Sequence, residues 1–352
     1  MMKYILIFVC CIFNICKAQK NDNFEQWIQL SDRQCKVNKY ERMINNNNSL
    51  AFRKLFINDS DTCLLLNFNH SNLLYLLRVN DKSIDSIKLP FKNIHDIHAV
   101  DYINNDSILV FFSKWDSFGY DKYYLLSINK KGEILKTYST INNLNGKDYF
   151  ITYVNNNTVL FNNKLTFIYL PRNRKQMSNK KFIFIYDLKK DSSYYLPIIY
   201  PQIDDKIYAE YLYPYFLWID ENNLLISYRF KSNMLKYNLK DNKITTIKTP
   251  MNEIDTNILY SPERSTINEI YSIIFPIQKL NIFRRYATLG YQYGKKMIEI
   301  YYDRNFNCIG KKIGITPWGS NEDGILYSVT QNNNKIVLKI IDSLKIEKFS
   351  EV

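Results

Sequence analysis

The chain has 352 residues, of which 46% are hydrophobic, 15% aromatic and 23% charged, and its formal net charge is +13. This length and apolar content can build a large buried core, which excludes an intrinsically disordered chain. Glycine and proline, nine of each, are too scarce for a fibrous or low-complexity protein. The basic residues are spread over turns and strand ends rather than gathered in one block, so we expect no nucleic-acid partner.

The first 18 residues have the layout of a secretory signal peptide. Met1-Met2-Lys3 is a short positive segment, residues 4–15 are apolar, and Cys16-Lys17-Ala18 places small residues before a cleavage point. The apolar run is too short to span a membrane. We therefore predict a signal peptide over residues 1–18 and a periplasmic or secreted mature chain.

A lipid anchor on Cys16 is the alternative processing route, and it would attach the chain to the outer membrane. Lipoprotein signals place a small residue before the modified cysteine, whereas this chain has Ile15 there. Soluble export is therefore favoured, with the anchor kept as the alternative.

Three cysteines remain after the leader: Cys35, Cys63 and Cys308. Their odd number and wide spacing fit neither a disulfide framework nor a zinc site. One bridge remains open as an alternative, and three buried thiols are the favoured interpretation.

Beyond the leader, short apolar runs of strand type recur along the whole chain. Asparagine, with 42 residues, is far more common than glycine and can adopt the left-handed conformation of tight turns. The runs pair into six predicted hairpins: 73–79 with 83–89, 123–129 with 133–138, 182–188 with 193–198, 234–239 with 243–248, 297–302 with 308–313, and 336–341 with 344–349.

Further strand-like runs precede these hairpins. The clearest are residues 215–219 and 224–230 before the fourth hairpin, and 97–103 and 107–113 before the second. Four antiparallel strands per unit and about 56 residues per unit are typical of propeller blades. We predict an all-β, six-bladed β-propeller forming a single domain over residues 19–352. A pair of β-sandwiches is less consistent with six similar units, and residues 24–30 (FEQWIQL) are the predicted N-terminal strand that closes the ring.

Residues 213–250, YPYFLWIDENNLLISYRFKSNMLKYNLKDNKITTIKTP, resemble a blade of the secreted six-bladed β-propellers (TolB-like, NHL-like) of the bacterial envelope. Within that group the chain is similar to an uncharacterised family of exported, often lipid-anchored proteins. The resemblance covers most of the mature chain as a pattern of hairpins. It implies the propeller fold and export, and it transfers no catalytic residue.

Catalytic and metal-binding signatures are weak. His95 and His98 are three residues apart, and in a strand such residues point to opposite faces, so we predict no metal there and a turn or channel-lining place for His98. The sequence contains neither a Gly-x-Ser-x-Gly elbow nor a phosphate-binding glycine-rich loop. We therefore expect no cofactor. Calcium belongs to the alternative function, which relies on acidic residues of predicted loops: Asp116, Asp204, Asp205, Glu210, Asp220 and Glu221.

The candidate ligand-binding set combines the loop aromatics Trp115, Tyr213 and Tyr215 with His98 and with the arginines Arg229, Arg284 and Arg285. Such residues together make a surface for stacking and hydrogen bonding. The predicted function is a non-catalytic binding or scaffolding module of the cell envelope for a carbohydrate, a peptide or an envelope protein. The alternative is an envelope hydrolase or lyase acting on a glycan, lactone or ester through channel carboxylates and calcium.

Overall fold

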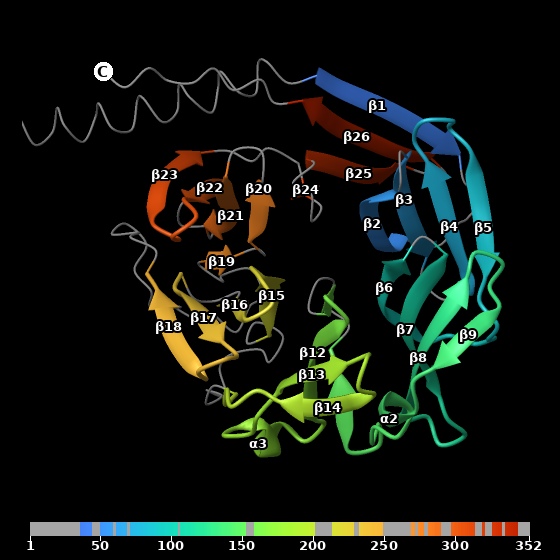
Figure 1. Cartoon of the computed structure of the whole chain (residues 1–352), viewed down its shortest axis with the longest axis horizontal. Coiled ribbons are helices and arrows are strands. Elements are labelled where there is room, and N and C mark those ends of the chain that lie inside the picture. The colour runs from blue at the N-terminus through green and yellow to red at the C-terminus, as the bar shows by residue number, and fades with distance from the viewer. Residues whose placement is uncertain are drawn as a thin grey trace, which may run out of the picture.

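The computed structural model describes residues 36–43, 50–58, 61–68, 71–104, 106–152, 158–200, 213–228, 232–248, 269–271, 274–277, 281–289, 297–313, 319–320, 326–332 and 335–343. Within these ranges the secondary structure is almost entirely β-strand (Figure 1). Two short helices, α2 (Ser139–Asn142) and α3 (Arg174–Met177), lie between strands. No helix in this part of the chain has the length and apolarity needed to cross a membrane.

The strands form six antiparallel sheets, which we number as blades around a ring (Figure 1). Blade 1 contains β2 (Leu50–Asn58), β3 (Asp61–Phe68), β4 (Leu73–Arg78) and β5 (Ile84–Lys88). Blade 2 contains β6 (Asp96–Asn104), β7 (Ser107–Trp115), β8 (Asp121–Asn129) and β9 (Ile134–Thr137). Blade 3 contains β10 (Tyr149–Ile151), β11 (Val159–Phe161), β12 (Lys164–Pro171), β13 (Ile183–Asp187) and β14 (Ser192–Tyr195), with β10 and β11 both paired to β12.

The second half of the chain repeats this order. Blade 4 contains β15 (Pro214–Trp218), β16 (Asn223–Tyr228), β17 (Met234–Asn238) and β18 (Lys243–Ile247). Blade 5 contains β19 (Glu269–Tyr271), β20 (Phe275–Ile277), β21 (Ile282–Leu289), β22 (Met297–Tyr302) and β23 (Cys308–Ile313), with β19 and β20 both paired to β21. Blade 6 contains β24 (Gly319–Ser320), β25 (Leu326–Asn332), β26 (Lys335–Ser343) and β1 (Lys36–Met43). The chain is therefore a six-bladed β-propeller, as predicted.

An N-terminal strand closes the ring, but it is β1 rather than residues 24–30. β1 pairs antiparallel with β26, Tyr40 opposite Leu338, and so completes blade 6 (Figure 1). The predicted strand at 24–30 lies outside the described residues, as does the predicted strand at 344–349. Because β1 occupies the outer position of blade 6, that blade joins the two ends of the chain.

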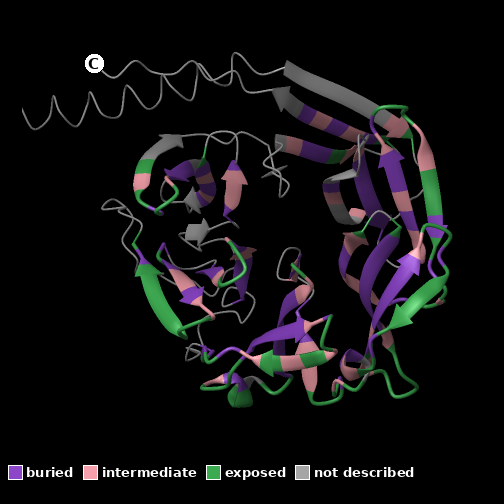
Figure 2. Cartoon of the chain, viewed as in Figure 1, coloured by how far each residue is buried: buried purple, intermediate pink, exposed green. Residues whose placement is uncertain are grey.

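The blades pack face to face through apolar side chains. In β7 seven consecutive residues are buried, because a middle strand of a blade has a neighbouring blade on each face (Figure 2). The outer strand β9 is exposed at all four positions. Cys63 belongs to the core between blades 1 and 2, whereas Cys308 packs against the core between blades 4 and 5, so the two thiols do not bond to each other. Cys35 lies outside the described residues.

Asparagines form many of the tight turns, as the composition predicts. Positive φ angles occur at Asn162 and Asn163 in the two-residue turn before β12, and at Asn242 in the turn before β18. An asparagine tolerates this conformation better than most residues do, because its short polar side chain can hydrogen-bond locally. These turns set the register of the hairpins that hold each blade together.

Candidate binding site

The β7–β8 hairpin of blade 2 presents two large aromatic side chains to solvent. Trp115 is 62% exposed at the end of β7, and Phe118 is 83% exposed in the turn. The Asp116 carboxylate fixes this turn, since its Oδ1 accepts hydrogen bonds from the backbone N–H groups of Phe118 at 2.8 Å and Tyr120 at 2.9 Å. The aromatic rings are therefore held out on an ordered turn, as expected of a contact surface.

A charged network lies beside the Trp115 ring. The His95 ring packs against it with 4.3 Å between centroids. His95 Nδ1 is 3.1 Å from Asp121 Oδ1 and 3.4 Å from Asp96 Oδ2. The Arg172 guanidinium donates from Nη2 to Asp121 Oδ2 at 2.6 Å. Arg172 follows β12 of blade 3, whereas Asp96 and Asp121 belong to blade 2. The network therefore joins the two blades next to the Trp115 ring.

Gly146 allows the two blades to approach at this point. Arg172 Nε donates to the carbonyl oxygen of Gly146 at 2.9 Å. A Cβ atom at position 146 would lie 1.6 Å from the carbonyl oxygen of Asp121. Only glycine fits this close backbone contact.

His98 lies in β6, where its ring packs against Phe111 and Tyr123 with centroid distances of 5.1 and 5.8 Å. Both ring nitrogens are buried without a hydrogen-bond partner, as is the nearby Ser113 hydroxyl. Burial lowers the pKa of His98 to about 4, against the attraction of the Asp121 carboxylate and with a smaller contribution from His95. The His98 imidazole is therefore neutral at pH 7. The hydroxyl of Tyr123 accepts from Ile151 N at 2.9 Å and ties blade 3 to the same place.

Four residues of the predicted binding set are buried rather than exposed on loops. Tyr213 and Tyr215 are each 7% exposed, and Arg284 and Arg285 are buried within β21. Tyr213 packs in the apolar core between blades 3 and 4. The physical reason is that each strand between two blades is covered on both faces, so its aromatic residues become core.

Arg285 has a structural role that the sequence did not indicate. Its Nη1 donates to the carbonyl oxygen of Ser232 at 2.6 Å, and its Nη2 donates to that of Tyr228 at 2.8 Å. Both carbonyls belong to blade 4: Tyr228 ends β16, and Ser232 lies two residues before β17. Arg285 therefore links blade 5 to blade 4. Arg229, the remaining arginine of the predicted set, lies outside the described residues.

Trp115 and His98 thus both belong to blade 2, whereas Tyr213 and Tyr215 lie at β15 of blade 4 and Arg284 and Arg285 lie in β21 of blade 5. The sequence indicated Trp115 but neither Asp121 nor Arg172. Asp121 and Arg172 are 51 positions apart, so no local sequence pattern joins them.

The two histidines of this region differ in their contacts. His95 Nδ1 lies close to the carboxylates of Asp121 and Asp96, whereas both ring nitrogens of His98 are buried without a hydrogen-bond partner. In the ranges given above, no three side chains of His, Cys, Asp or Glu gather as metal ligands. Asp116 and Asp220 are engaged in their own turns, and Asp204, Asp205 and Glu210 lie outside those ranges.

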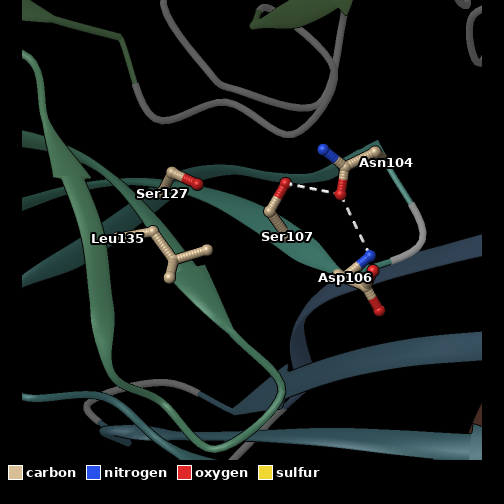
Figure 3. Close-up of a pocket in the computed structure, with 5 residues that line it drawn as sticks. All are labelled: Asn104, Asp106, Ser107, Ser127 and Leu135. Carbon is tan, nitrogen blue, oxygen red and sulfur yellow. Dashed lines mark hydrogen bonds between the residues drawn. The ribbon is translucent and has the colours of Figure 1, made fainter.

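A separate cavity of about 510 Å³ lies at the opposite end of blade 2 (Figure 3). Its lining residues are Asn104, Asp106, Ser107, Ser127 and Leu135. Asn104 Oδ1 accepts hydrogen bonds from Ser107 Oγ at 2.9 Å and from Asp106 N at 3.0 Å (Figure 3). These contacts form the β6–β7 turn, so Asn104 Oδ1 and the Ser107 hydroxyl are engaged in the turn itself.

The comparisons give no family, and a solved structure with a TM-score of 0.56 supports the fold. No model of a known protein family matches the sequence, and no curated protein matches it. Among solved structures, the chain is similar to a member of the DUF4221 family from Bacteroides vulgatus, with 14% identity, a TM-score of 0.56, and coverage of 87% of this chain and 98% of the other. A Bacteroides fragilis protein described as exported gives 8% identity and a TM-score of 0.49, covering 87% of this chain and 96% of the other. A TolB-like protein of Agrobacterium tumefaciens gives 13% identity and a TM-score of 0.41, covering 88% of this chain and 99% of the other.

Proposed function

We propose that the chain is an exported binding module of the cell envelope that recognises a carbohydrate. The binding surface is the group Trp115, Phe118, His95, Asp121 and Arg172, which we call the Trp115 surface. The observation that carries the proposal is the exposed Trp115 ring packed against His95, beside the Asp121–Arg172 pair.

This arrangement suits a sugar ring in two ways. An indole with one face on His95 can offer its other face to the apolar C–H groups of the sugar. The Asp121 carboxylate accepts hydrogen bonds from hydroxyl groups, and the Arg172 guanidinium donates them. An apolar wall with a few fixed polar groups is the usual composition of a small-molecule site.

Export is supported by the leader predicted over residues 1–18 and by the resemblance to exported propellers. Cleavage before Gln19 gives a soluble mature chain, whereas a lipid on Cys16 would anchor it to the outer membrane. The intact mass of the native protein separates the two. A chain that begins at Gln19 supports soluble export, and a diacylglyceryl adduct on Cys16 supports the anchor.

The test of binding uses the mature chain, residues 19–352, on a glycan array followed by titration calorimetry with the glycans retained. Trp115→Ala should weaken binding at least tenfold and leave the circular dichroism spectrum unchanged. The matched control is Ile244→Ala, which removes another exposed apolar side chain, 45% exposed on the outer strand β18 of blade 4. Equal affinities of the wild type and Trp115→Ala, or binding of peptides and no glycan, would contradict the proposal.

A further inference from the structure

One of the six interfaces between blades differs from the others. Hydrophobic clusters of described residues fill the interfaces of blades 1–2, 2–3, 3–4, 4–5 and 6–1. In the same part of the chain no such cluster joins blade 5 to blade 6. The face that blade 5 turns toward blade 6 carries the charged residues Arg284 and Glu299 beside apolar side chains, and the Arg284 guanidinium lies over the Phe275 ring with 6.0 Å from Cζ to the ring centroid. The buried charges make this interface a place to look for a ligand.

The direction in which the Arg284 side chain points follows from that of Arg285, the next residue in β21. Arg285 reaches carbonyl groups of blade 4, and successive residues of a strand point to opposite faces. Arg284 therefore points toward blade 6. Glu299 and Tyr301 of β22 lie on the same face, with Arg284 opposite Tyr301 in the ladder.

The Arg284 guanidinium is only partly satisfied. The residue is 2% exposed, and its Nη1 is 3.4 Å from Glu299 Oε1. Glu299 also accepts a hydrogen bond from the Tyr301 hydroxyl at 2.6 Å. Nε and Nη2 of Arg284 are buried and have no hydrogen-bond partner. These two nitrogens form the edge of a guanidinium that donates two parallel hydrogen bonds to a carboxylate or phosphate.

We propose that the Nε–Nη2 edge of Arg284 binds an oxyanion, a carboxylate or a phosphate, in the interface between blades 5 and 6. A buried charged group whose donors lack partners is unfavourable, and an oxyanion supplies both acceptors at once. This site is separate from the Trp115 surface and does not depend on the proposed carbohydrate.

A second cation compensates the Glu299 charge that would oppose an anion. In blade 6, Leu338 and Ile340 pack toward blade 1, so Lys339 between them points toward blade 5. Arg284 and Lys339 together outweigh the single carboxylate of Glu299, which favours an anionic occupant over a neutral one.

The experiment titrates the mature chain with inorganic phosphate and, separately, with acetate, at constant ionic strength set by sodium chloride. Thermal unfolding is followed in both series. A ligand that binds only the folded chain raises the unfolding midpoint in proportion to the logarithm of its concentration. We expect such a rise, and the anion that acts at the lower concentration shows whether the site prefers a tetrahedral phosphate or a planar carboxylate.

Two arginine variants localise the effect. Arg284→Lys keeps the positive charge and removes the paired donors, so the affinity for the anion should fall at least tenfold. Arg285→Lys is the matched control on the opposite face of β21, and it should lower the starting midpoint while keeping the same response to the anion. If Arg284→Lys does not fold, wild-type crystals soaked in selenate should show an anomalous peak within hydrogen-bond distance of Nε and Nη2.

Three results overturn the proposal. One is the absence of any response of the wild type to both anions. Another is an equal response of the wild type and folded Arg284→Lys, which places the anion elsewhere on the basic chain. The third is a selenate peak away from Arg284. A Trp115→Ala variant should respond to phosphate like the wild type, so this site and the carbohydrate proposal can fail independently.

Discussion

The guanidinium of Arg172 in blade 3 lies 2.6 Å from the carboxylate of Asp121 in blade 2, measured from Nη2 to Oδ2. Asp121 is 15% exposed and Arg172 is 39% exposed, so the pair lies at the edge of the blade 2–3 interface rather than in its core. The same carboxylate contacts His95, on which Trp115 rests. This ion pair therefore links the packing of two blades to the position of the exposed indole.

We predict a measurable coupling between these two residues. Asp121→Asn and Arg172→Met should each destabilise the fold, and a double-mutant cycle by urea unfolding should give a coupling free energy of about 1 kcal/mol, the upper range for partly exposed pairs. The coupling should shrink in 1 M sodium chloride because salt screens exposed charges. A coupling near zero at low salt would show that the contact does not join the blades.

Replacement of Arg285 by methionine should destabilise the fold strongly. The change removes two charge-assisted hydrogen bonds and leaves the carbonyls of Tyr228 and Ser232 buried without this donor. The expected loss is about 3 kcal/mol in the free energy of unfolding. Arg304→Met is the control, because Arg304 is exposed in the β22–β23 turn of the same blade. Similar unfolding midpoints for the two variants would count against this role of Arg285.

Removal of β1 should open the ring. A chain that begins at residue 44 lacks the partner of β26 and exposes the N–H and C=O groups of that strand. We expect dimers or larger aggregates in size-exclusion chromatography and a lower unfolding midpoint. The control begins at residue 36 and keeps β1. A monomeric, equally stable chain without β1 would contradict closure by this strand.

Much of the fold could be predicted from the sequence because blade strands are local. The predicted runs 97–103 and 107–113 correspond to β6 and β7, and the predicted hairpin 234–239 with 243–248 corresponds to β17 and β18. The closing strand was misplaced because β1, with the sequence KVNKYERM, has few apolar residues. An outer strand of a blade has a neighbouring strand on one side only, so its sequence shows a weak apolar pattern. The pairing of β1 with β26 also joins the two ends of the chain, so no local pattern predicts it.

The candidate site was harder to predict because its contacts join different blades. Arginine in a strand-like run suggests an exposed position, yet Arg285 is buried because carbonyl groups 53 and 57 residues away accept its hydrogen bonds. Among the predicted residues that the structure describes, Trp115 has the exposure that the sequence indicated, at 62%. Its turn is local, since Asp116 binds the backbone of the next few residues.

The stability of the fold should depend on the protonation of His98. Its pKa is about 4 in the folded chain, because its imidazole is buried, and near its ordinary value of 6.5 in the unfolded chain. Between these values the unfolded chain binds a proton that the folded chain does not. His98 therefore leaves stability unchanged above pH 6.5, lowers it as the pH falls from 6.5 to 4, and has no further effect below 4.

The expected loss from His98 over that interval is about 3 kcal/mol in the free energy of unfolding. Urea unfolding at a series of pH values measures it, and NMR titration of the His98 ring reports the folded-state pKa directly. His98→Leu keeps an apolar side chain against Phe111 and Tyr123, so it should flatten the stability profile between pH 6.5 and 4. Ile244→Ala in the outer strand of blade 4 serves as the control and should leave that slope in place. An unchanged profile in His98→Leu would mean that His98 titrates normally in the folded chain and that its nitrogens reach solvent.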